Sequence, residues 1–325
     1  MDTGKIFNIR NESEFHSLAM DTFRYQSQNV PTYKSFISHL KLDPHKINNY
    51  HKIPFLPVEL FKSHEIIVLN KKAEIVFESS STTGINPSKH FVADKSLYEK
   101  SFRAGFQKFY GDPSKLCILA LLPSYLERSG SSLIFMAEKL IGLSSHPDSG
   151  FYLNEYDKLI ALLRKLKKNG QPTLLLGVSF ALLELAEKFE EDLEGITIME
   201  TGGMKGKRTE MVREDLHAFL RKRLNTANIH SEYGMTELLS QAYSKGEGIF
   251  NTPPWMRILI RDSYDPFQIL ELGYTGSINV IDLANTYSCS FIATSDLGRI
   301  QKDGGFEVLG RIDNSDIRGC NLMIG

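Results

Sequence analysis

The stretch Glu78-Ser79-Ser80-Ser81-Thr82-Thr83-Gly84-Ile85-Asn86-Pro87-Ser88-Lys89 lies between two segments of clear periodicity. Residues 73–77 form a short apolar run that predicts a strand, and residues 94–110 carry apolar side chains at helical spacing. A hydroxyl- and glycine-rich turn between a strand and a helix can bind phosphate through its backbone N–H groups, and Lys89 adds a point charge. By itself such a stretch is more often a plain connecting loop, and it lacks the Walker A spacing.

The segments that follow alternate between strand and helix patterns, which predicts a sheet covered by helices. The expected strands are residues 116–122, 173–176 and 196–199. The expected helices are residues 131–143, 156–168, 180–189 and a segment capped by Thr209 that extends to about Leu224. We therefore predict an α/β fold for the main body of the chain.

Both ends of the chain differ from this body. Near the N-terminus, a capping box at Asn11 begins one helix, residues 33–40 predict a second, and residues 53–58 predict an extended connection. After residue 251, short strands with glycine-rich turns are expected at residues 255–260, 276–282, 290–293 and 306–309. The expected domains are an α/β body over residues 1–250, helical or extended in its first 72 residues, and a small β-rich lobe over residues 251–325.

The composition is that of an ordinary globular enzyme, with 325 residues, 42% hydrophobic and 24% charged, and a net charge of −1. Such a balance does not suggest a nucleic-acid partner. We expect no secretory signal, because residues 1–5 lack an apolar run. The longest apolar stretch, residues 174–186, is too short and too interrupted for a transmembrane segment. The three cysteines lack metal-type spacing, so we expect a reduced, cytoplasmic protein in which Cys117 and Cys289 are structural.

Two later motifs indicate that the Ser/Thr stretch is more than a connecting loop. One is Ser231-Glu232-Tyr233-Gly234-Met235-Thr236-Glu237, and the other runs from Thr294-Ser295-Asp296 through Gly310-Arg311-Ile312-Asp313 to Arg318-Gly319. In this order the three motifs resemble the signature of the adenylate-forming (ANL) enzymes. The likeness is greatest to the LuxE-type acyl-protein synthetases of bacterial bioluminescence, then to phenylacetate-CoA ligases. It spans about residues 75 to 320 and implies the large N-terminal ANL domain, with helix-covered sheets and a small β-rich lobe, lacking the C-terminal lid domain.

The resemblance implies an ATP site. Residues expected at the pyrophosphate end of ATP are Ser80, Ser81, Thr82, Thr83, Gly84 and Lys89. Here Ser81 replaces a glycine that is common in the family, which could stiffen the loop. Gly202 and Gly203 resemble the turn that forms one wall of the adenine site, although a simple strand-to-helix connection explains them equally well.

The second and third motifs imply the remaining contacts. Tyr233 is expected to stack on adenine, Gly234 to allow close approach, Thr236 to contact the α-phosphate and Glu237 to hold Mg²⁺. The alternative for Thr236 and Glu237 is a helix N-terminus, because apolar residues follow them. Asp296 resembles the aspartate that accepts hydrogen bonds from both ribose hydroxyls, Arg311 an arginine that contacts ribose or phosphate, and Asp313 the hinge residue.

The end of the chain affects the expected acyl acceptor. No lysine follows Lys302, and the lid that admits coenzyme A in larger relatives is not expected, which makes coenzyme A a less attractive acceptor. Acyl-protein synthetases carry the acyl group on a cysteine at a position that Cys320 matches, beside Arg318 and Gly319. The alternative is that Cys320 is only a small tail residue.

These observations predict an ATP-dependent acyl-protein synthetase. A fatty or related carboxylate would become acyl-AMP, then a thioester on Cys320, and then pass to a partner protein, which in luminous bacteria is an acyl reductase. The second hypothesis is a ligase that delivers acyl or aryl groups to coenzyme A or a carrier protein. The third is an inactive adenylate-binding scaffold, against which the presence of Glu237, Asp296 and Arg311 together argues.

Overall fold

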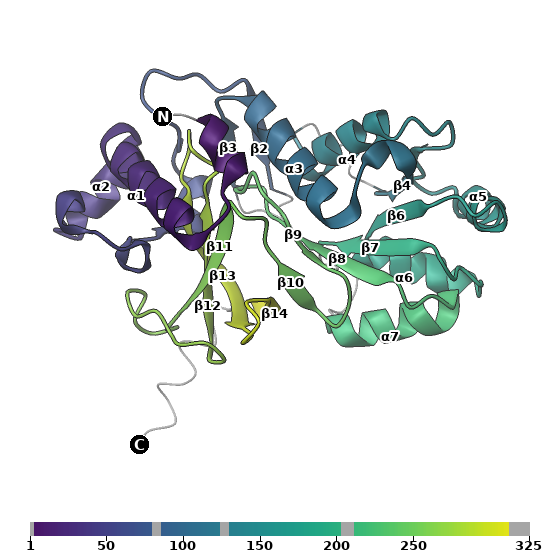
Figure 1. Cartoon of the computed structure of the whole chain (residues 1–325). Coiled ribbons are helices and arrows are strands. Elements are labelled where there is room, and N and C mark those ends of the chain that lie inside the picture. The colour runs from purple at the N-terminus through teal and green to yellow at the C-terminus, as the bar shows by residue number, and fades with distance from the viewer. Residues whose placement is uncertain (1–2, 80–85, 124–129, 203–210, 312–325) are drawn as a thin grey trace. The chain divides into compact units, whose positions relative to one another are not determined.

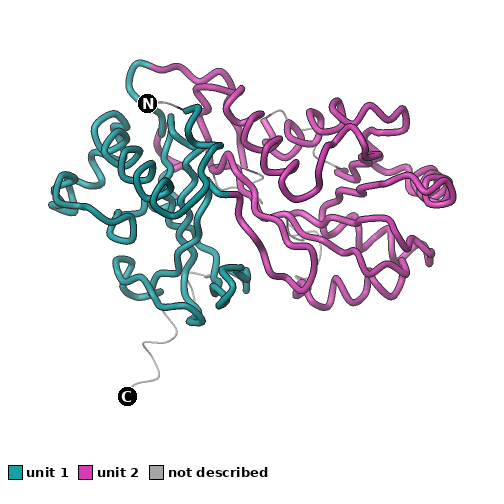
Figure 2. The backbone as a smooth tube through the Cα atoms, viewed as in Figure 1, with its two compact units in different colours: residues 1–60, 66–70, 254–325 teal, residues 61–65, 71–253 magenta. Residues whose placement is uncertain are grey.

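The computed structural model describes residues 3–79, 86–123, 130–202 and 211–311. The chain divides into two compact units (Figure 2). Unit 1 consists of residues 1–60, 66–70 and 254–325, and unit 2 of residues 61–65 and 71–253. The expected lobe begins close to the start of the last unit 1 segment. The N-terminal part, however, groups with that lobe, whereas we expected it in the α/β body.

Unit 2 is built on a mixed sheet with the strand order β10-β9-β8-β7-β6-β4-β5. Its strands are β4 (Cys117–Leu121), β5 (Gly150–Phe151), β6 (Thr173–Val178), β7 (Thr197–Thr201), β8 (Ile229–Tyr233), β9 (Ala242–Ser244) and β10 (Ile249–Asn251). The pairs β5–β4, β4–β6, β6–β7 and β7–β8 are parallel, and β9 and β10 are added antiparallel. β4 and β6 are buried along their whole length, because helices cover both faces of a parallel sheet.

Helices cover this sheet as the alternating pattern predicts. They are α3 (Lys95–Tyr110), α4 (Ser132–Leu143), α5 (Tyr156–Lys168), α6 (Ser179–Lys188) and α7 (Arg213–Leu224). Figure 1 shows α3 and α4 on one face of the sheet and α6 and α7 on the other. The expected mixed α/β fold with a helix-covered sheet is confirmed. α7 begins at Arg213, and its expected cap, Thr209, lies outside the described residues.

The Ser/Thr stretch has a different context from the expected strand, turn and helix. It connects β2 (Ile75–Glu78) to a second strand, β3 (Lys89–Val92), and the two form an antiparallel hairpin. The helix α3 begins only after β3, with Asp94 as its N-cap. β3 was missed because it is only four residues long and its alternation of exposed and buried side chains is too short to stand out.

Unit 1 combines helices from the N-terminal part with the β-rich lobe. It holds α1 (Glu12–Asn29) and α2 (Pro31–His39), with the antiparallel strands β11 (Met256–Arg261), β12 (Thr275–Asp282), β13 (Phe291–Ile300) and β14 (Phe306–Arg311). The short β1 (Leu56–Pro57) pairs in parallel with β13. The buried Gln26 of α1 also donates to the carbonyl oxygens of Asn285 and Thr286, at 3.0 and 2.9 Å. These bonds explain why the N-terminal part groups with the β-rich lobe.

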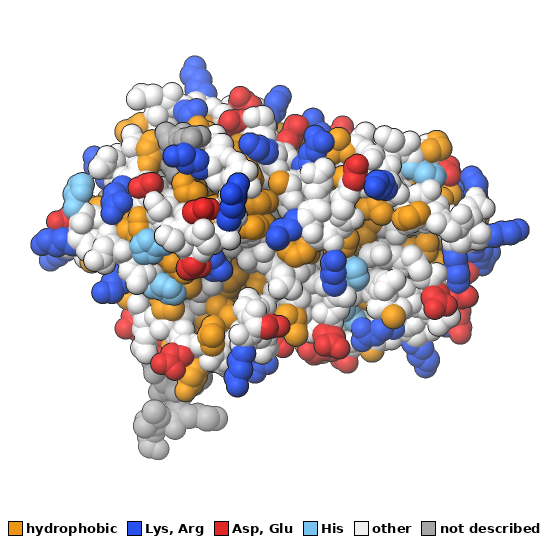
Figure 3. Space-filling view, in the orientation of Figure 1, with side chains coloured by type: hydrophobic (Ala, Val, Ile, Leu, Met, Phe, Trp, Pro, Cys, Tyr) orange, Lys and Arg blue, Asp and Glu red, His pale blue; other side chains and the backbone are white. Residues whose placement is uncertain are grey.

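Short 3₁₀ helices complete the described structure, at Thr3–Asn8, Pro44–Lys46, Tyr50–Lys52, Val58–Lys62 and Pro113–Lys115. Within the described ranges no helix is long and apolar enough to cross a membrane. On the face drawn in Figure 3, basic and acidic side chains are interspersed.

Candidate active site

The Tyr233–Glu237 motif follows β8, at the carboxyl end of a parallel strand, where open α/β sheets commonly bind ligands. Tyr233 is the last residue of β8 and pairs with Ala242 of β9. The chain then turns, with Leu238 N donating to the carbonyl oxygen of Met235 at 3.1 Å, and continues to β9. The alternative of a helix N-terminus at Thr236 is therefore wrong, because the apolar residues after Glu237 fill a buried turn and do not begin a helix.

Buried side chains anchor this turn, and one of them is Glu237, the expected Mg²⁺ ligand. Glu237, Leu238 and Leu239 are all buried. Ser240 Oγ lies 3.0 Å from Ser101 Oγ of α3, and both hydroxyls are buried. These contacts make the turn part of the packed interior of unit 2.

His90 joins this turn to the hairpin that carries the Ser/Thr stretch. Its side chain is fully buried on β3, and its Nδ1 donates to the carbonyl oxygen of Thr236 at 2.8 Å. The imidazole and the ring of Phe61 are arranged edge to face, with centroids 5.8 Å apart. Because a carbonyl oxygen only accepts, this bond requires the tautomer with a proton on Nδ1. The structure thus brings together two motifs that lie far apart in the sequence, since His90 and Thr236 are separated by 146 positions.

The described ends of the Ser/Thr stretch form a closed hairpin stem. Ser79 N donates to the carbonyl oxygen of Ser88 at 3.0 Å, and Ser88 N donates to Ser79 Oγ at 2.9 Å. Lys89 Nζ lies 3.4 Å from Glu78 Oε1, and both side chains are about half exposed. The expected phosphate contacts Ser80, Ser81, Thr82, Thr83 and Gly84 lie outside the described residues. Lys89 is therefore placed at the base of the loop, ion-paired but accessible.

Gly202 has the left-handed conformation expected of a glycine turn, with φ of 69°. It directly follows β7, and its carbonyl oxygen lies 2.7 Å from Ser179 Oγ, at the start of α6. Gly203, the second glycine of the expected adenine wall, lies outside the described residues.

Besides the expected approach of a ligand, the absence of a side chain at Gly234 leaves room for a neighbouring carboxylate. A Cβ at this position would overlap the carboxylate of Glu232, which folds back over the turn. Glu232 is buried and accepts a short hydrogen bond from Thr201 Oγ1. Burial raises the pKa of Glu232 to about 7; the bond from Thr201 lowers it in part, and the charge of Glu200 raises it. The carboxyl beside Tyr233 thus changes charge near neutral pH.

Asp296 and Arg311 both belong to unit 1 and are opposite each other in the β13–β14 register. Arg311 Nε donates to Asp296 Oδ1 at 3.1 Å. The Asp296 side chain is only 7% exposed, whereas that of Arg311 is 78% exposed. The structure therefore brings together two residues to which the third motif assigns nucleotide contacts.

The described residues could bind Mg²⁺ together with nucleotide phosphates, but they do not form a metal site on their own. Among the described residues, no group of three His, Cys, Asp or Glu side chains could hold a metal ion by itself. Mg²⁺ bound through nucleotide phosphates needs only one or two protein carboxylates, and the buried Glu237 offers one.

The two cysteines in the described part of the chain are both buried, as expected of structural residues. Cys117 and Cys289 are buried free thiols, and burial raises the pKa of both. Neither is activated as a nucleophile, because the thiolate is disfavoured in both places. Cys320 and Asp313 lie outside the described residues.

Sequence reasoning missed His90, Glu200 and Glu232. His90 follows Lys89 in a strand that was not predicted, so no pattern marked it. Glu200 and Glu232 each lie at or near the end of a strand. A carboxylate directly after an apolar run, here residues 196–199, is the one sequence signal that could have identified Glu200.

Comparison with known proteins shows a shared fold. No protein-family model matches the chain, and no curated protein sequence matches it either. Among solved structures, ATP-bound MatB from Rhodopseudomonas palustris is 18% identical, with a TM-score of 0.56 over 73% of this chain and 47% of MatB. An open conformation of 2-hydroxyisobutyryl-CoA ligase in complex with 2-HIB-AMP and CoA is 13% identical, with a TM-score of 0.68 over 93% of this chain and 70% of the ligase.

This chain has the fold of these proteins. It spans about half of the length of MatB, 47% in the match to the ATP-bound structure. Identities of 13% and 18% establish fold alone, because one fold supports many activities.

Proposed function

We propose that this protein activates a carboxylate with ATP, forming acyl-AMP and pyrophosphate, as a member of the adenylate-forming superfamily. The proposal rests first on the bond between His90 Nδ1 and the Thr236 carbonyl oxygen, since it connects the strand leaving the Ser/Thr loop to the Tyr233–Glu237 turn. Two motifs assigned to one nucleotide are thereby adjacent in unit 2. The shared fold supports it as well, because MatB was solved with ATP and the 2-hydroxyisobutyryl-CoA ligase with an acyl adenylate.

In this reaction a carboxylate oxygen attacks the α-phosphorus of ATP, and the bond to pyrophosphate breaks. The protein must position the two reactants and neutralise the charge that builds on the phosphates. We assign Thr236 to the α-phosphate, the hydroxyls of residues 80–83 with Lys89 to pyrophosphate, and Glu237 to Mg²⁺, which would neutralise phosphate charge. Tyr233 is assigned to adenine, Asp296 to the ribose hydroxyls, and Arg311 to ribose or phosphate.

The first test is ATP–pyrophosphate exchange with a panel of carboxylates that includes fatty, aryl and hydroxy acids. At least one acid should support exchange, and Glu237→Gln should reduce its rate by on the order of 10²–10³, the usual effect of removing one electrostatic contact to the transition state. Glu214→Gln, an exposed carboxylate of α7, is the matched control and should keep the wild-type rate. If no acid supports exchange the proposal is wrong, and a near-wild-type Glu237→Gln at saturating Mg²⁺ would remove the role of that residue.

We further propose that the acyl group passes to Cys320 and then to a partner protein. The Cys320 thiolate would attack the acyl carbon, AMP would leave, and a thioester would result. The support is the resemblance of the Arg318-Gly319-Cys320 segment to the acyl-protein synthetases. A second candidate acceptor is coenzyme A, which the complex of 2-hydroxyisobutyryl-CoA ligase with CoA favours.

Labelling with radioactive fatty acid and ATP separates these two acceptors. Cys320→Ser should keep exchange and lose covalent labelling, because a serine hydroxyl is a far weaker nucleophile than a thiolate at neutral pH. Cys117→Ala is the control, since that thiol is buried in β4 and should not carry the label. A Cys320→Ser protein that labels as well as wild type would put coenzyme A or a carrier protein first.

A further inference from the structure

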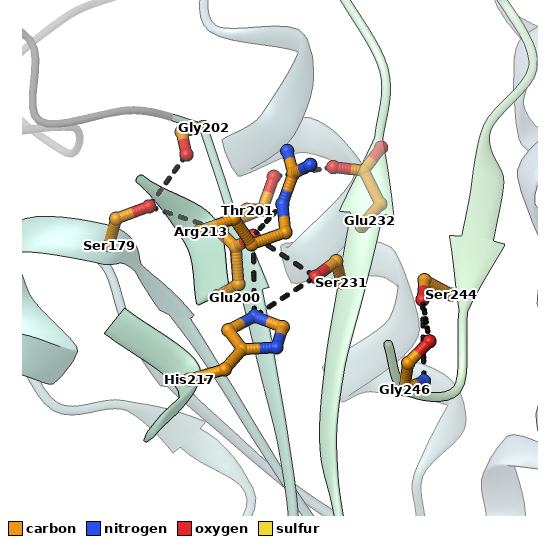
Figure 4. Close-up of polar contacts among 10 residues, drawn as sticks. All are labelled: Ser179, Glu200, Thr201, Gly202, Arg213, His217, Ser231, Glu232, Ser244 and Gly246. Carbon is orange, nitrogen blue, oxygen red and sulfur yellow. Dashed lines mark hydrogen bonds and ion pairs between the residues drawn. The ribbon is translucent and has the colours of Figure 1, made fainter. Parts of the chain in front are cut away.

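A buried polar cluster lies at the carboxyl ends of β6, β7 and β8 in unit 2, and none of the three sequence motifs includes its centre (Figure 4). Its members are Ser179, Glu200, Arg213, His217 and Ser231, with the pair Thr201 and Glu232 beside them. Ser179, Glu200, His217 and Ser231 are each no more than 4% exposed. The cluster is therefore an internal feature of the unit.

Glu200 stands at the centre and uses both carboxylate oxygens. Oε1 accepts from Arg213 Nε at 2.9 Å and from Ser231 Oγ at 3.0 Å. Oε2 lies 2.9 Å from Ser179 Oγ. His217 Nε2 lies 3.3 Å from Ser231 Oγ and 3.7 Å from Glu200 Oε1. Four elements are tied together by one side chain.

The ionised form of Glu200 is stabilised by these partners. Burial alone would raise the pKa of the Glu200 carboxyl, but the nearby imidazole of His217 and the charge and hydrogen bond of Arg213 hold that pKa below its ordinary value. A buried ion pair adds little net stability compared with apolar residues of the same size, so stability alone does not account for it. Its value lies in the positions that it imposes on the segments it joins.

Three routes lead from Glu200 to the segments assigned to adenine. Ser179 lies within hydrogen-bond distance of the Gly202 carbonyl oxygen as well as of Glu200. Ser231 is on β8, two residues before Tyr233. The guanidinium of Arg213 lies 5.0 Å from the centre of the Phe250 ring, which in turn contacts the Tyr233 ring at 6.0 Å. The first and third routes run through direct contacts, and the second runs along the backbone of β8.

We propose that Glu200 is a positioning residue for the nucleotide, holding the Gly202 turn and Tyr233 in the relative geometry that adenine requires. This inference rests on the proposed function. Glu200 itself touches no reactant. Its loss should therefore weaken ATP binding while leaving the chemical step nearly unchanged.

The register of the sheet offers a matched pair of variants. Ser231 of β8 is directly opposite Ser244 of β9, and both side chains are fully buried. Ser231 Oγ donates to Glu200, whereas Ser244 Oγ donates to the carbonyl oxygen of Gly246 at 2.8 Å (Figure 4). Replacing either serine by alanine removes one buried hydroxyl from neighbouring strands, but only Ser231 contacts Glu200.

The experiment measures ATP affinity by calorimetry and the KM for ATP and kcat in pyrophosphate exchange. Glu200→Gln should raise both the Kd and the KM for ATP by about tenfold with kcat within about threefold, because a residue that acts on a ligand only through its neighbours has a modest effect on affinity. Ser231→Ala should shift the Kd in the same direction by a smaller factor, and Ser244→Ala should leave it unchanged.

The outcomes are distinguishable from failure of the proposed function. If the wild-type protein binds no ATP, the proposed function and this inference both fall. If wild type binds ATP and folded Glu200→Gln binds it equally well, the inference alone is overturned. The inference is also overturned if Ser231→Ala and Ser244→Ala shift the Kd for ATP equally. This comparison of the two serine variants tests the inference even if Glu200→Gln does not fold.

Discussion

The Asp296 carboxylate is buried on β13, whereas its partner Arg311 is mostly exposed at the end of β14. A buried carboxylate with a charged neighbour binds hydroxyl donors well, because both oxygens accept and the ionised form needs no further desolvation. Thr294 Oγ1 accepts from Asp296 N at 3.2 Å and fixes the backbone at this place.

Asp296→Asn should weaken ATP binding, because the amide keeps one acceptor but presents a donor to the second ribose hydroxyl. The loss should be roughly 1.5–3 kcal/mol, the range for hydrogen bonds to charged groups. Calorimetric titration with ATP measures it. Glu307→Gln is the control, since Glu307 forms a similar ion pair with Arg299 across the same two strands, 2.7 Å apart. Equal ATP affinity for wild type and Asp296→Asn would contradict the assignment of Asp296.

The first helix illustrates how a local pattern becomes an element. Asn11 is the N-cap of α1, and its side chain accepts from Glu14 N at 3.0 Å, as the capping pattern predicts. The side chain of Glu14 reaches back to Arg10 N at 2.8 Å, one residue before the cap. The start of α1 therefore depends on side-chain acceptors for its unpaired backbone donors.

Asn11→Ala should destabilise unit 1 by about 1 kcal/mol, because the first turn of α1 loses a backbone hydrogen-bond acceptor. Denaturant unfolding followed by circular dichroism measures this change. Asn11→Asp keeps an acceptor at the same position and adds a charge that suits a helix N-terminus, so it should retain wild-type stability. An Asn11→Ala protein as stable as Asn11→Asp would show that the cap contributes nothing.

At the scale of the whole molecule, stability should depend on pH through the buried Glu232. Its pKa is raised from 4.5 in the unfolded chain to about 7, so the folded state holds the proton more tightly. The stability that Glu232 contributes is present below pH 4.5 and is lost as pH rises through about 7. His230 acts in the opposite direction: burial lowers its pKa to about 4, so its contribution is lost as pH falls below 6.5.

Glu232→Gln isolates the first effect. The variant should gain stability relative to wild type by on the order of 2–4 kcal/mol between pH 4.5 and 8, from 1.36 kcal/mol per pKa unit. The difference between the two unfolding free energies, measured by urea titration at several pH values, removes the His230 contribution because both proteins share it. Parallel pH profiles would mean that the carboxyl of Glu232 is not perturbed by folding.

Local patterns determined much of the secondary structure. The helix over residues 156–168 has the bounds predicted from its periodicity, because apolar side chains three and four positions apart define one helix face without reference to the rest of the chain. The strand at residues 117–121 was predicted for a similar reason, since a short continuous apolar run suits a strand buried on both faces. The three motifs that suggest nucleotide chemistry were also readable directly.

Only the tertiary structure decided how these parts combine. The segment after Tyr233, for which a helix N-terminus was the alternative, is a turn, and β3 stands between the Ser/Thr stretch and α3. Pairing with other strands outweighs weak local preference in such short segments. The bond from His90 to Thr236 and the contacts of Glu200 with Ser179 and Ser231 join residues that are 146, 21 and 31 positions apart. The contacts of Glu200 depend on the order and register of parallel strands, and the bond from His90 depends on how a separate hairpin packs. Periodicity along one segment contains neither kind of information.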